Sequence, residues 1–341
     1  MIGLPTVKEA LFYEASESGE VVCMTCERRC RIWSGLKGFC KTRVNINSKL
    51  YTLVYGDISS ISANPIEKKP FFHFHPGTLA LTAGTWSCNF TCLWCQNFEI
   101  SKTPPDPRKA NYIRPERFVE IALNHGCDGT SISFNEPTLL LEYSLDLFPL
   151  AKKKGLYNTY VSNGYMTMKV LDALAESGLD AIKFDVKGDE EVYEKYCGGV
   201  REEVVWRNAH RAKELGLHVE IVNLVIPGVN DDEDCLKQLV EKHIKELGSD
   251  TPLHFTRYHP EYKFNAPSTP VKTLEKAREL ARSLGVLFPY VGNVPGHRYE
   301  NTWCPACSEL LIQRLGFNVL SNRVTSGGKC PKCGFQIPLV W

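Results

Sequence analysis

The sequence predicts an α/β fold with a mainly parallel sheet, and three features of residues 79–291 support this prediction. Apolar runs of strand length alternate with amphipathic stretches of helix length, as in consecutive β/α units. The runs lack strict alternation of apolar and polar residues, as expected for strands covered on both faces. Polar, Gly and Pro residues follow the runs, where the loops of such folds gather active groups. We therefore expect six or seven β/α units in an open, partial (β/α)6 TIM-like barrel.

Seven segments have the composition of strands, and helix boundary signals lie between them. The predicted strands are 79–84, 130–134, 157–161, 181–186, 218–226, 253–258 and 286–291. Pro115 begins a predicted helix at 115–125, and glycines mark the ends of predicted helices at Gly126, Gly155, Gly178, Gly216 and Gly285. Residues 99–114 are rich in Pro and charge and are predicted to form a surface loop. The barrel is predicted at 79–291, with small cysteine-rich modules at 1–78 and 292–341.

Composition narrows the class of protein. The 40 Lys and Arg residues nearly balance 39 Asp and Glu residues, so no overall charge favours nucleic acid or an anionic membrane as a partner. No apolar run is long enough to span a bilayer, and the first 20 residues lack a secretory pattern, so a cytoplasmic location is expected. Most of the 14 cysteines cluster at short spacings, which favours metal or cluster ligation over disulfides. Three stand alone and are expected to be small buried residues, namely Cys127, Cys197 and Cys235.

The central cysteine motif follows the first predicted strand. Cys88, Cys92 and Cys95 place three thiolates within eight residues. Three protein ligands to a [4Fe–4S] cluster leave one iron open, whereas a purely electron-transferring cluster normally has four. An open iron can chelate S-adenosylmethionine, and the reduced cluster can then break one of its carbon–sulfur bonds. A zinc site completed by another residue is the alternative.

The C-x3-C-x2-C spacing, with Trp94 before the last cysteine, resembles the signature of the radical S-adenosylmethionine superfamily. Residues 79–265 resemble in particular the pyruvate formate-lyase activating enzyme group of glycyl-radical activases. The segments 64–77 and 292–301 resemble a narrower group, the radical S-adenosylmethionine component associated with Memo-like and AMMECR1-like proteins. The resemblance implies cleavage of S-adenosylmethionine to a 5′-deoxyadenosyl radical that abstracts hydrogen from a protein or small-molecule substrate. It also implies an electron donor such as flavodoxin or ferredoxin.

The resemblance implies cofactor contacts at the ends of successive strands. Asn135 and Glu136 match a Gly-Gly-Glu-Pro motif that holds the methionine amino group, although Phe134 and Asn135 replace its glycines. Ser162 and Asn163 match a Thr-Asn-Gly motif. The remaining implied contacts are Asp185 and Lys187 for the carboxylate, the ribose or a nearby cation, His259 for the cofactor, and Trp94 for the adenine.

Two further cysteine groups flank the predicted barrel. Cys304, Cys307, Cys330 and Cys333 form two Cys-x2-Cys knuckles at the spacing of a zinc ribbon, with an iron–sulfur cluster or a single iron as alternatives. Cys23, Cys26, Cys30 and Cys40 are spaced irregularly, which fits zinc or an auxiliary cluster.

A hypothesis of a different class stays open on sequence alone. The chain could be a non-catalytic zinc or iron–sulfur protein that binds RNA or a partner protein. That reading predicts metal at the cysteine groups but gives no reason for polar residues at successive strand ends. Nucleic acid is the weaker partner, because the segment between the C-terminal knuckles lacks a strong basic and aromatic surface.

Overall fold

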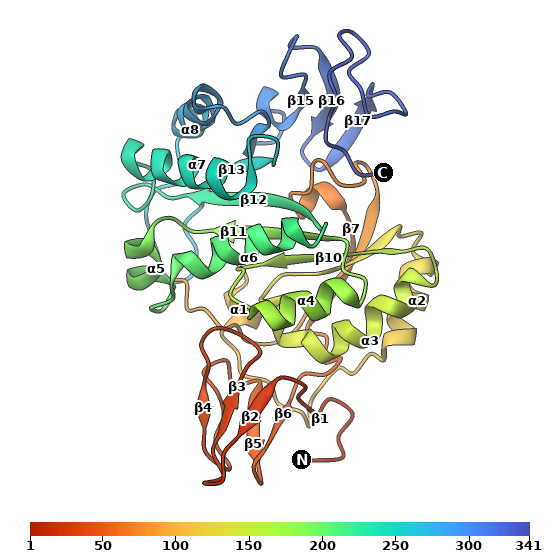
Figure 1. Ribbon diagram of the computed structural model, residues 1–341, viewed down its shortest axis with the longest axis vertical. Coiled ribbons are helices and arrows are strands. Elements are labelled where there is room, and N and C mark those ends of the chain that lie inside the picture. Colours follow the sequence, from red (N-terminus) through yellow and green to blue (C-terminus); the bar gives the residue numbers. More distant parts are fainter.

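The computed structural model describes residues 1–341 and has an eight-stranded sheet at its centre (Figure 1). The strand order is β14-β13-β12-β11-β10-β9-β8-β7. Seven of these strands run parallel, and only β7 is antiparallel to its neighbour β8. The strands are β7 (Ser60–Pro65), β8 (Leu79–Gly84), β9 (Gly129–Ile132), β10 (Tyr157–Ser162), β11 (Ala181–Val186), β12 (His218–Val225), β13 (Leu253–Arg257) and β14 (Pro289–Gly292). The predicted α/β fold is confirmed, and the sheet is open because β7 and β14 are its two edges.

A helix follows each of the first six parallel strands and returns the chain to the next one. These helices are α2 (Pro115–Asn124), α3 (Leu141–Lys152), α4 (Met168–Glu176), α6 (Glu202–Glu214), α7 (Glu233–Leu247) and α8 (Val271–Leu284). Two shorter helices, α1 (Phe98–Ser101) and α5 (Glu190–Cys197), lie in the loops after β8 and β11. The segment predicted as a loop at 99–114 therefore begins within a short helix.

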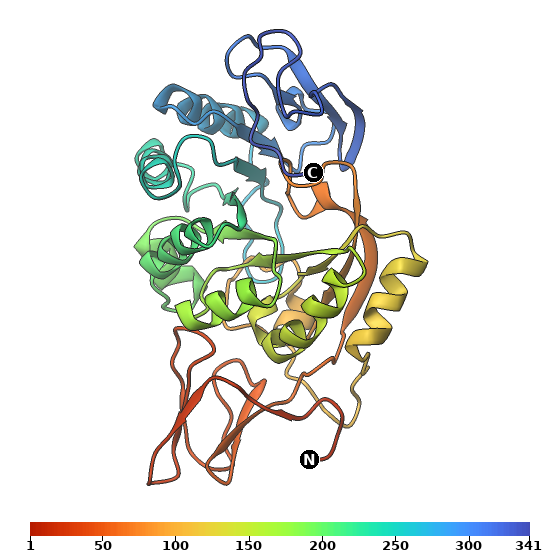
Figure 2. The same cartoon turned by 45° about the vertical axis from the view of Figure 1, so that its right-hand side comes forward.

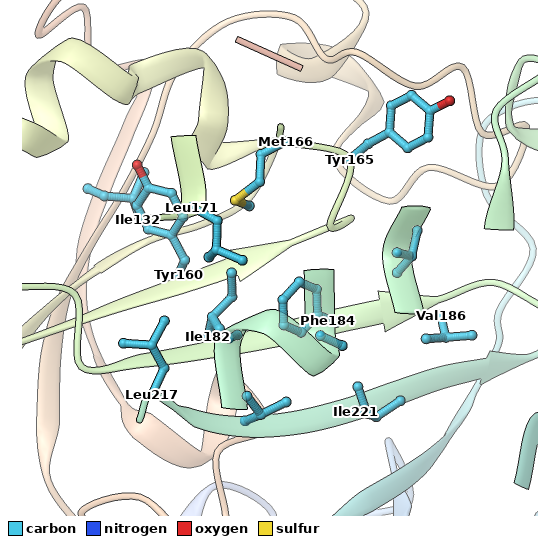
Figure 3. Packing of buried hydrophobic residues seen from close by; sticks show 14 of the residues in the cluster. Ile132, Tyr160, Tyr165, Met166, Leu171, Ile182, Phe184, Val186, Leu217 and Ile221 are labelled. Carbon is cyan, nitrogen blue, oxygen red and sulfur yellow. The ribbon is translucent and has the colours of Figure 1, made fainter. Parts of the chain in front are cut away.

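The main core lies between the sheet and its helices. In Figure 3, Ile182 and Phe184 of β11 lie near Leu171 of α4, and these three residues and Val186 of the same strand are fully buried. Since successive strand residues point to opposite faces, Lys183 and Asp185 of the same strand point away from these helices. One face of the sheet is therefore apolar, and the other can carry polar groups.

The segment after β7 closes one end of the sheet. It contains the short 3-10 helix η1 (Ile66–Lys68). The backbone N–H groups of Phe72 and His73 both donate to Glu220 Oε1 of β12 at 2.8 Å. β7 and this closing segment precede residue 79, where the sequence had placed the start of the barrel. The antiparallel edge strand was missed because the sequence pattern sought was that of parallel β/α units.

The two ends of the chain form small β-modules at opposite ends of the molecule (Figures 1 and 2). The N-terminal module has two three-stranded sheets, ordered β1-β6-β5 and β2-β3-β4, and the C-terminal module has one, ordered β15-β16-β17. Their strands are β1 (Lys8–Glu9), β2 (Tyr13–Ala15), β3 (Val21–Cys23), β4 (Arg31–Ile32), β5 (Arg43–Ile46), β6 (Lys49–Thr52), β15 (Thr302–Trp303), β16 (Leu310–Leu315) and β17 (Asn318–Asn322). The 3-10 helix η3 (Arg298–Glu300) precedes β15, and η2 (Pro137–Leu140) precedes α3. None of the helices combines the length and apolarity needed to span a bilayer.

Candidate functional site

A cavity of about 490 Å³ lies on the face of the sheet opposite the helices and opens near the carboxyl ends of the strands. It is lined by residues from the loops after β8, β9 and β10, from the strands β11 to β13, and from the segment after β7. The predicted site residues among them are Cys88, Cys92, Trp94, Cys95, Asn135, Glu136, Asn163, Asp185 and Lys187. Nine side chains that are far apart in the sequence therefore share one cavity.

The cysteine loop after β8 presents its three sulfurs to this cavity. The backbone N–H of Phe90 donates to Cys88 Sγ at 3.4 Å, and Cys95 Sγ lies 3.0 Å from Ser101 Oγ. Burial raises the pKa of the Cys88 thiol to about 12. A hydrogen bond from Cys197 lowers the pKa of Cys92 to about 6, with Lys187 and Lys102 acting in the same direction against burial. The loop thus combines a desolvated site with donors and cations that stabilise thiolate.

Glu136 is held in a network that joins three strand ends. Its Oε1 accepts hydrogen bonds from Ser162 Oγ at 2.8 Å and from the Thr138 N–H at 3.1 Å, and its Oε2 accepts from the Asn163 N–H at 2.9 Å. Burial raises the pKa of this carboxyl group, and the three donors oppose the rise. Asn163 continues the network, since its Nδ2 donates to Asn89 Oδ1 at 2.7 Å beside Cys88. The carboxylate position is therefore fixed relative to the cysteine loop.

Two lysine side chains flank the Asp185 carboxylate at the end of β11. Lys183 Nζ donates to Asp185 Oδ1, and Lys187 Nζ lies 3.2 Å from Asp185 Oδ2. Burial alone would raise the pKa of Asp185, but Lys183 and Lys187 outweigh it and lower the pKa to about 2. Asp185 therefore stays ionised throughout the neutral range and holds both lysines at the cavity wall.

Trp94 and Asn135 complete the predicted lining. Trp94 is 3% exposed and packs against Tyr196 and Phe264, with ring centroids 5.7 Å apart in both pairs. Asn135 Nδ2 donates to Ser87 O at 2.7 Å, and its Oδ1 accepts from the Thr85 N–H at 3.1 Å. The Asn135 side chain thus braces the start of the cysteine loop.

Two predicted contacts lie outside the cavity lining. Ser162 is buried behind Glu136 and acts on the cavity through that carboxylate. His259 is exposed and does not line the cavity.

Several lining residues were missed by the sequence reasoning. Lys183 could have been found, because a lysine within the apolar run 181–186 is unusual for a buried strand. No sequence pattern indicated that Lys69 would line the cavity or that Cys197 would contact Cys92, because each depends on the packing of a distant segment. Cys197 is buried as expected for a lone cysteine.

The C-terminal cysteines form a compact metal-binding geometry. The sulfurs of Cys304, Cys307, Cys330 and Cys333 all lie within 4.8 Å of one another. Two pairs are close, with Cys304 Sγ 3.5 Å from Cys333 Sγ and Cys307 Sγ 3.7 Å from Cys330 Sγ. Four thiolates bound about 2.3 Å from one tetrahedral ion lie about 3.8 Å apart. This group therefore fits a single metal ion.

The N-terminal cysteines share one site. Cys23, Cys26, Cys30 and Cys40 line a small pocket together with Arg28, Arg43 and Asn89. None of these four cysteines forms a disulfide, and the same is true of Cys88, Cys92 and Cys95. Arg28 Nε donates to Asn89 O at 2.5 Å, so the pocket adjoins the central cysteine loop.

Comparison with known proteins gives three findings. A sequence model of the Radical SAM superfamily, where SAM denotes S-adenosylmethionine, matches residues 85–239. An uncharacterized protein of Methanocaldococcus jannaschii is 42% identical over 336 residues, which cover 98% of this chain and 100% of that protein. The pyruvate formate-lyase 1-activating enzyme of Escherichia coli K12 is 23% identical over 214 residues, which cover 58% of this chain and 86% of the enzyme.

Among solved structures, a domain of the pyruvate-formate lyase-activating enzyme from Bacteroides vulgatus superposes with a TM-score of 0.43 and 20% identity. The superposition covers 48% of this chain and 99% of that domain.

Proposed function

We propose that this chain, which has a radical S-adenosylmethionine domain at residues 85–239, binds a [4Fe–4S] cluster and S-adenosylmethionine in the described cavity. The observation that carries the proposal is the convergence of Cys88, Cys92 and Cys95 with Glu136 and Asp185 on one cavity. The non-catalytic alternative gives no reason for acidic and basic side chains to meet beside three cysteines.

The cysteine loop fits a cluster with three protein ligands. Its three cysteines line one cavity, and no fourth cysteine lines it with them, which suits a cluster that keeps one iron open. When bound, such a cluster would supply the electron that cleaves S-adenosylmethionine and leaves a 5′-deoxyadenosyl radical. The Phe90 N–H would donate to the Cys88 thiolate, and Lys102 and Lys187 would offset the negative charge of the thiolates.

The remaining predicted residues would bind and orient S-adenosylmethionine. Glu136 offers a carboxylate to its amino group, while Ser162 and Asn163 hold that carboxylate in place. Lys187, fixed by Asp185, offers a cation to the carboxylate or ribose. Trp94 offers an apolar wall for the adenine. The exposed position of His259 gives no support for a contact, so His259 is not part of this proposal.

The fold suits a reaction that must exclude water. The sheet and the segment after β7 form the cavity walls away from its mouth, so a radical formed at the cysteine loop would be sheltered from solvent reductants on those sides. We propose activase-like hydrogen abstraction from a protein or small molecule, with reduction by a carrier such as flavodoxin or ferredoxin. The association with Memo-like and AMMECR1-like proteins is part of the same proposal.

We propose different metal contents for the two flanking groups. The C-terminal group would hold one zinc ion, since its sulfur spacing suits a single tetrahedral ion. The N-terminal group would hold an auxiliary iron–sulfur cluster, which fits its irregular cysteine spacing and its place beside the central cysteine loop. The Phe39 N–H, which donates to Cys30 Sγ at 3.4 Å, parallels the Phe90 contact to Cys88.

An anaerobic assay tests the proposal. The reconstituted protein is reduced with dithionite and given S-adenosylmethionine, and 5′-deoxyadenosine is quantified. We expect production in the native protein, none in Cys88→Ala, and near-native production in Cys235→Ala, whose cysteine lies outside every cysteine group. A fully loaded, reducible cluster that gave no 5′-deoxyadenosine would refute the proposal.

A further inference from the structure

Lys69 is a buried cation without an anionic partner. The protein buries four Lys or Arg side chains almost completely, namely Arg43, Lys69, Lys183 and Arg314. Arg43 is paired with Glu142 and Lys183 with Asp185, while Arg314 donates to Phe72 O and Thr302 Oγ1. Lys69 is 3% exposed, and its side chain makes no hydrogen bond or ion pair. Lys69 makes one cation–π contact, with the Phe134 ring, whose centroid lies 4.8 Å from Lys69 Nζ.

The surroundings of Lys69 oppose a positive charge. Burial lowers the pKa of its amino group to about 7, and the nearby charges of Lys68 and Lys183 lower it further. No acidic side chain acts on it from within the protein. Holding a lysine here therefore costs stability, and such costs are typical of functional positions.

Lys69 lines the 490 Å³ cavity on the segment after β7, and its amino group lies beside the Phe134 ring. This segment continues to Phe72 and His73, which bind Glu220 of β12. Lys183 precedes Asp185 by two residues on the same face of β11 and therefore lies farther from the carboxyl end of the strand, at what we call the inner end of the cavity. In the sheet register Glu220 lies beside Lys183 and Val222 beside Asp185, and of these two β12 residues only Val222 lines the cavity. The inner end of the cavity therefore presents two lysines, of which Lys183 is paired with Asp185 and Lys69 has no anionic partner.

We propose that this inner end binds an anionic group of the substrate, a carboxylate or a phosphate, through the Lys69 amino group. The proposal rests on the function proposed above and adds the substrate class. The substrate would be a molecule with an anionic end, and this end would lie deeper in the cavity than the atom that reacts. An anion there would supply the charge partner that the protein itself withholds, and it would anchor the substrate within the cavity.

Binding of simple anions tests this assignment without requiring catalysis. Inorganic phosphate and acetate are titrated separately into the full-length protein by isothermal calorimetry, with and without saturating S-adenosylmethionine. The variants are Lys69→Met, which keeps the length but removes the charge, and Lys69→Arg, which keeps the charge. Lys153→Met, which removes an exposed lysine at the end of α3, is the matched control. Circular dichroism establishes that each variant is folded.

We expect at least one anion to bind the native protein, with affinity reduced at least tenfold in Lys69→Met and within about threefold of native in Lys69→Arg and Lys153→Met. Phosphate binding without acetate binding would assign a phosphate, and the reverse a carboxylate. The proposal is overturned if neither anion binds, if Lys69→Met binds as well as native, or if S-adenosylmethionine displaces the anion and so claims the site for its own carboxylate. Because anion binding needs no cluster reduction, its failure is distinguishable from a failure to cleave S-adenosylmethionine.

Discussion

Glu142→Gln removes one charge from the ion pair that fastens the N-terminal module to the barrel. Arg43 of β5 and Glu142 of α3 are 2% and 1% exposed, and Arg43 Nη1 lies 2.6 Å from Glu142 Oε1. The two residues are 99 positions apart in the sequence, so the pair forms only when the module is docked.

The expected loss in the free energy of unfolding follows from the small number of polar partners that Arg43 and Glu142 have. Arg43 Nε and Nη2 and Glu142 Oε2 are buried without a hydrogen bond, so Glu142 is the only side chain that forms an ion pair with Arg43. Removing one partner of a buried ion pair costs about 3–5 kcal/mol. Gln keeps an acceptor oxygen for Arg43, so we expect a loss of about 3 kcal/mol, at the lower end of that range.

Urea unfolding followed by circular dichroism measures this loss. Glu120→Gln is the matched control, because Glu120 pairs with Arg117 at the surface, where the two side chains are 52% and 55% exposed. Such surface pairs contribute at most about 1 kcal/mol. Replacing Arg43 and Glu142 together by Met should restore the free energy of unfolding to within about 1 kcal/mol of native, because no charge is then left buried.

A Glu142→Gln loss no larger than that of the surface control would refute this reasoning. It would mean that Arg43 is solvated in solution and that the N-terminal module does not dock on α3 as described. A double Met variant as unstable as the single variant would also count against it, because packing rather than charge would then dominate.

Three further changes probe the cavity, the C-terminal metal group and the closing segment. Glu136→Gln should weaken S-adenosylmethionine binding at least tenfold in equilibrium dialysis, because a carboxylate within a fixed network is lost. The control Glu116→Gln, which changes an exposed residue, should bind S-adenosylmethionine normally. Equal affinities of the two variants would contradict the role of Glu136. Cys307→Ser should lower the metal content by one ion per chain in elemental analysis without changing the iron content, and a loss of iron would contradict the proposed zinc ion. Burial lowers the pKa of His73 to about 3, so between pH 6.5 and pH 5 the unfolded chain gains a proton that the folded protein does not. When the pH is lowered over that interval, the free energy of unfolding should therefore decrease by about 2 kcal/mol more in the native protein than in His73→Gln. Parallel pH profiles of the two proteins would exclude a buried neutral His73.

The parallel strands and the cysteine motif were accessible from the sequence because their signals are local. Each strand is a short apolar run followed by a turn, and Cys88, Cys92 and Cys95 lie within one loop. The resemblance to the radical S-adenosylmethionine superfamily then assigned Glu136 and Asp185 to one site, and both line the cavity. The presence of a C-terminal metal group was similarly accessible, because two Cys-x2-Cys knuckles carry their own spacing.

Other parts of the site depend on contacts between distant segments, which no local pattern specifies. His259 follows a strand end as its motif requires, yet the loop that carries it leaves the side chain exposed. β7 joins the sheet as an antiparallel edge, and Cys197 reaches Cys92 from the end of α5, in the connection after β11.

The sequence alone determined the fold class, the superfamily resemblance and most of the predicted site residues that line the cavity, because hydrophobic period and motif spacing are properties of short segments. Only the tertiary structure decided where the segment after β7 goes and that Lys69 is buried there without a partner. Burial and the lack of a counter-charge are properties of the packed chain, since they depend on every segment that excludes water from the lysine.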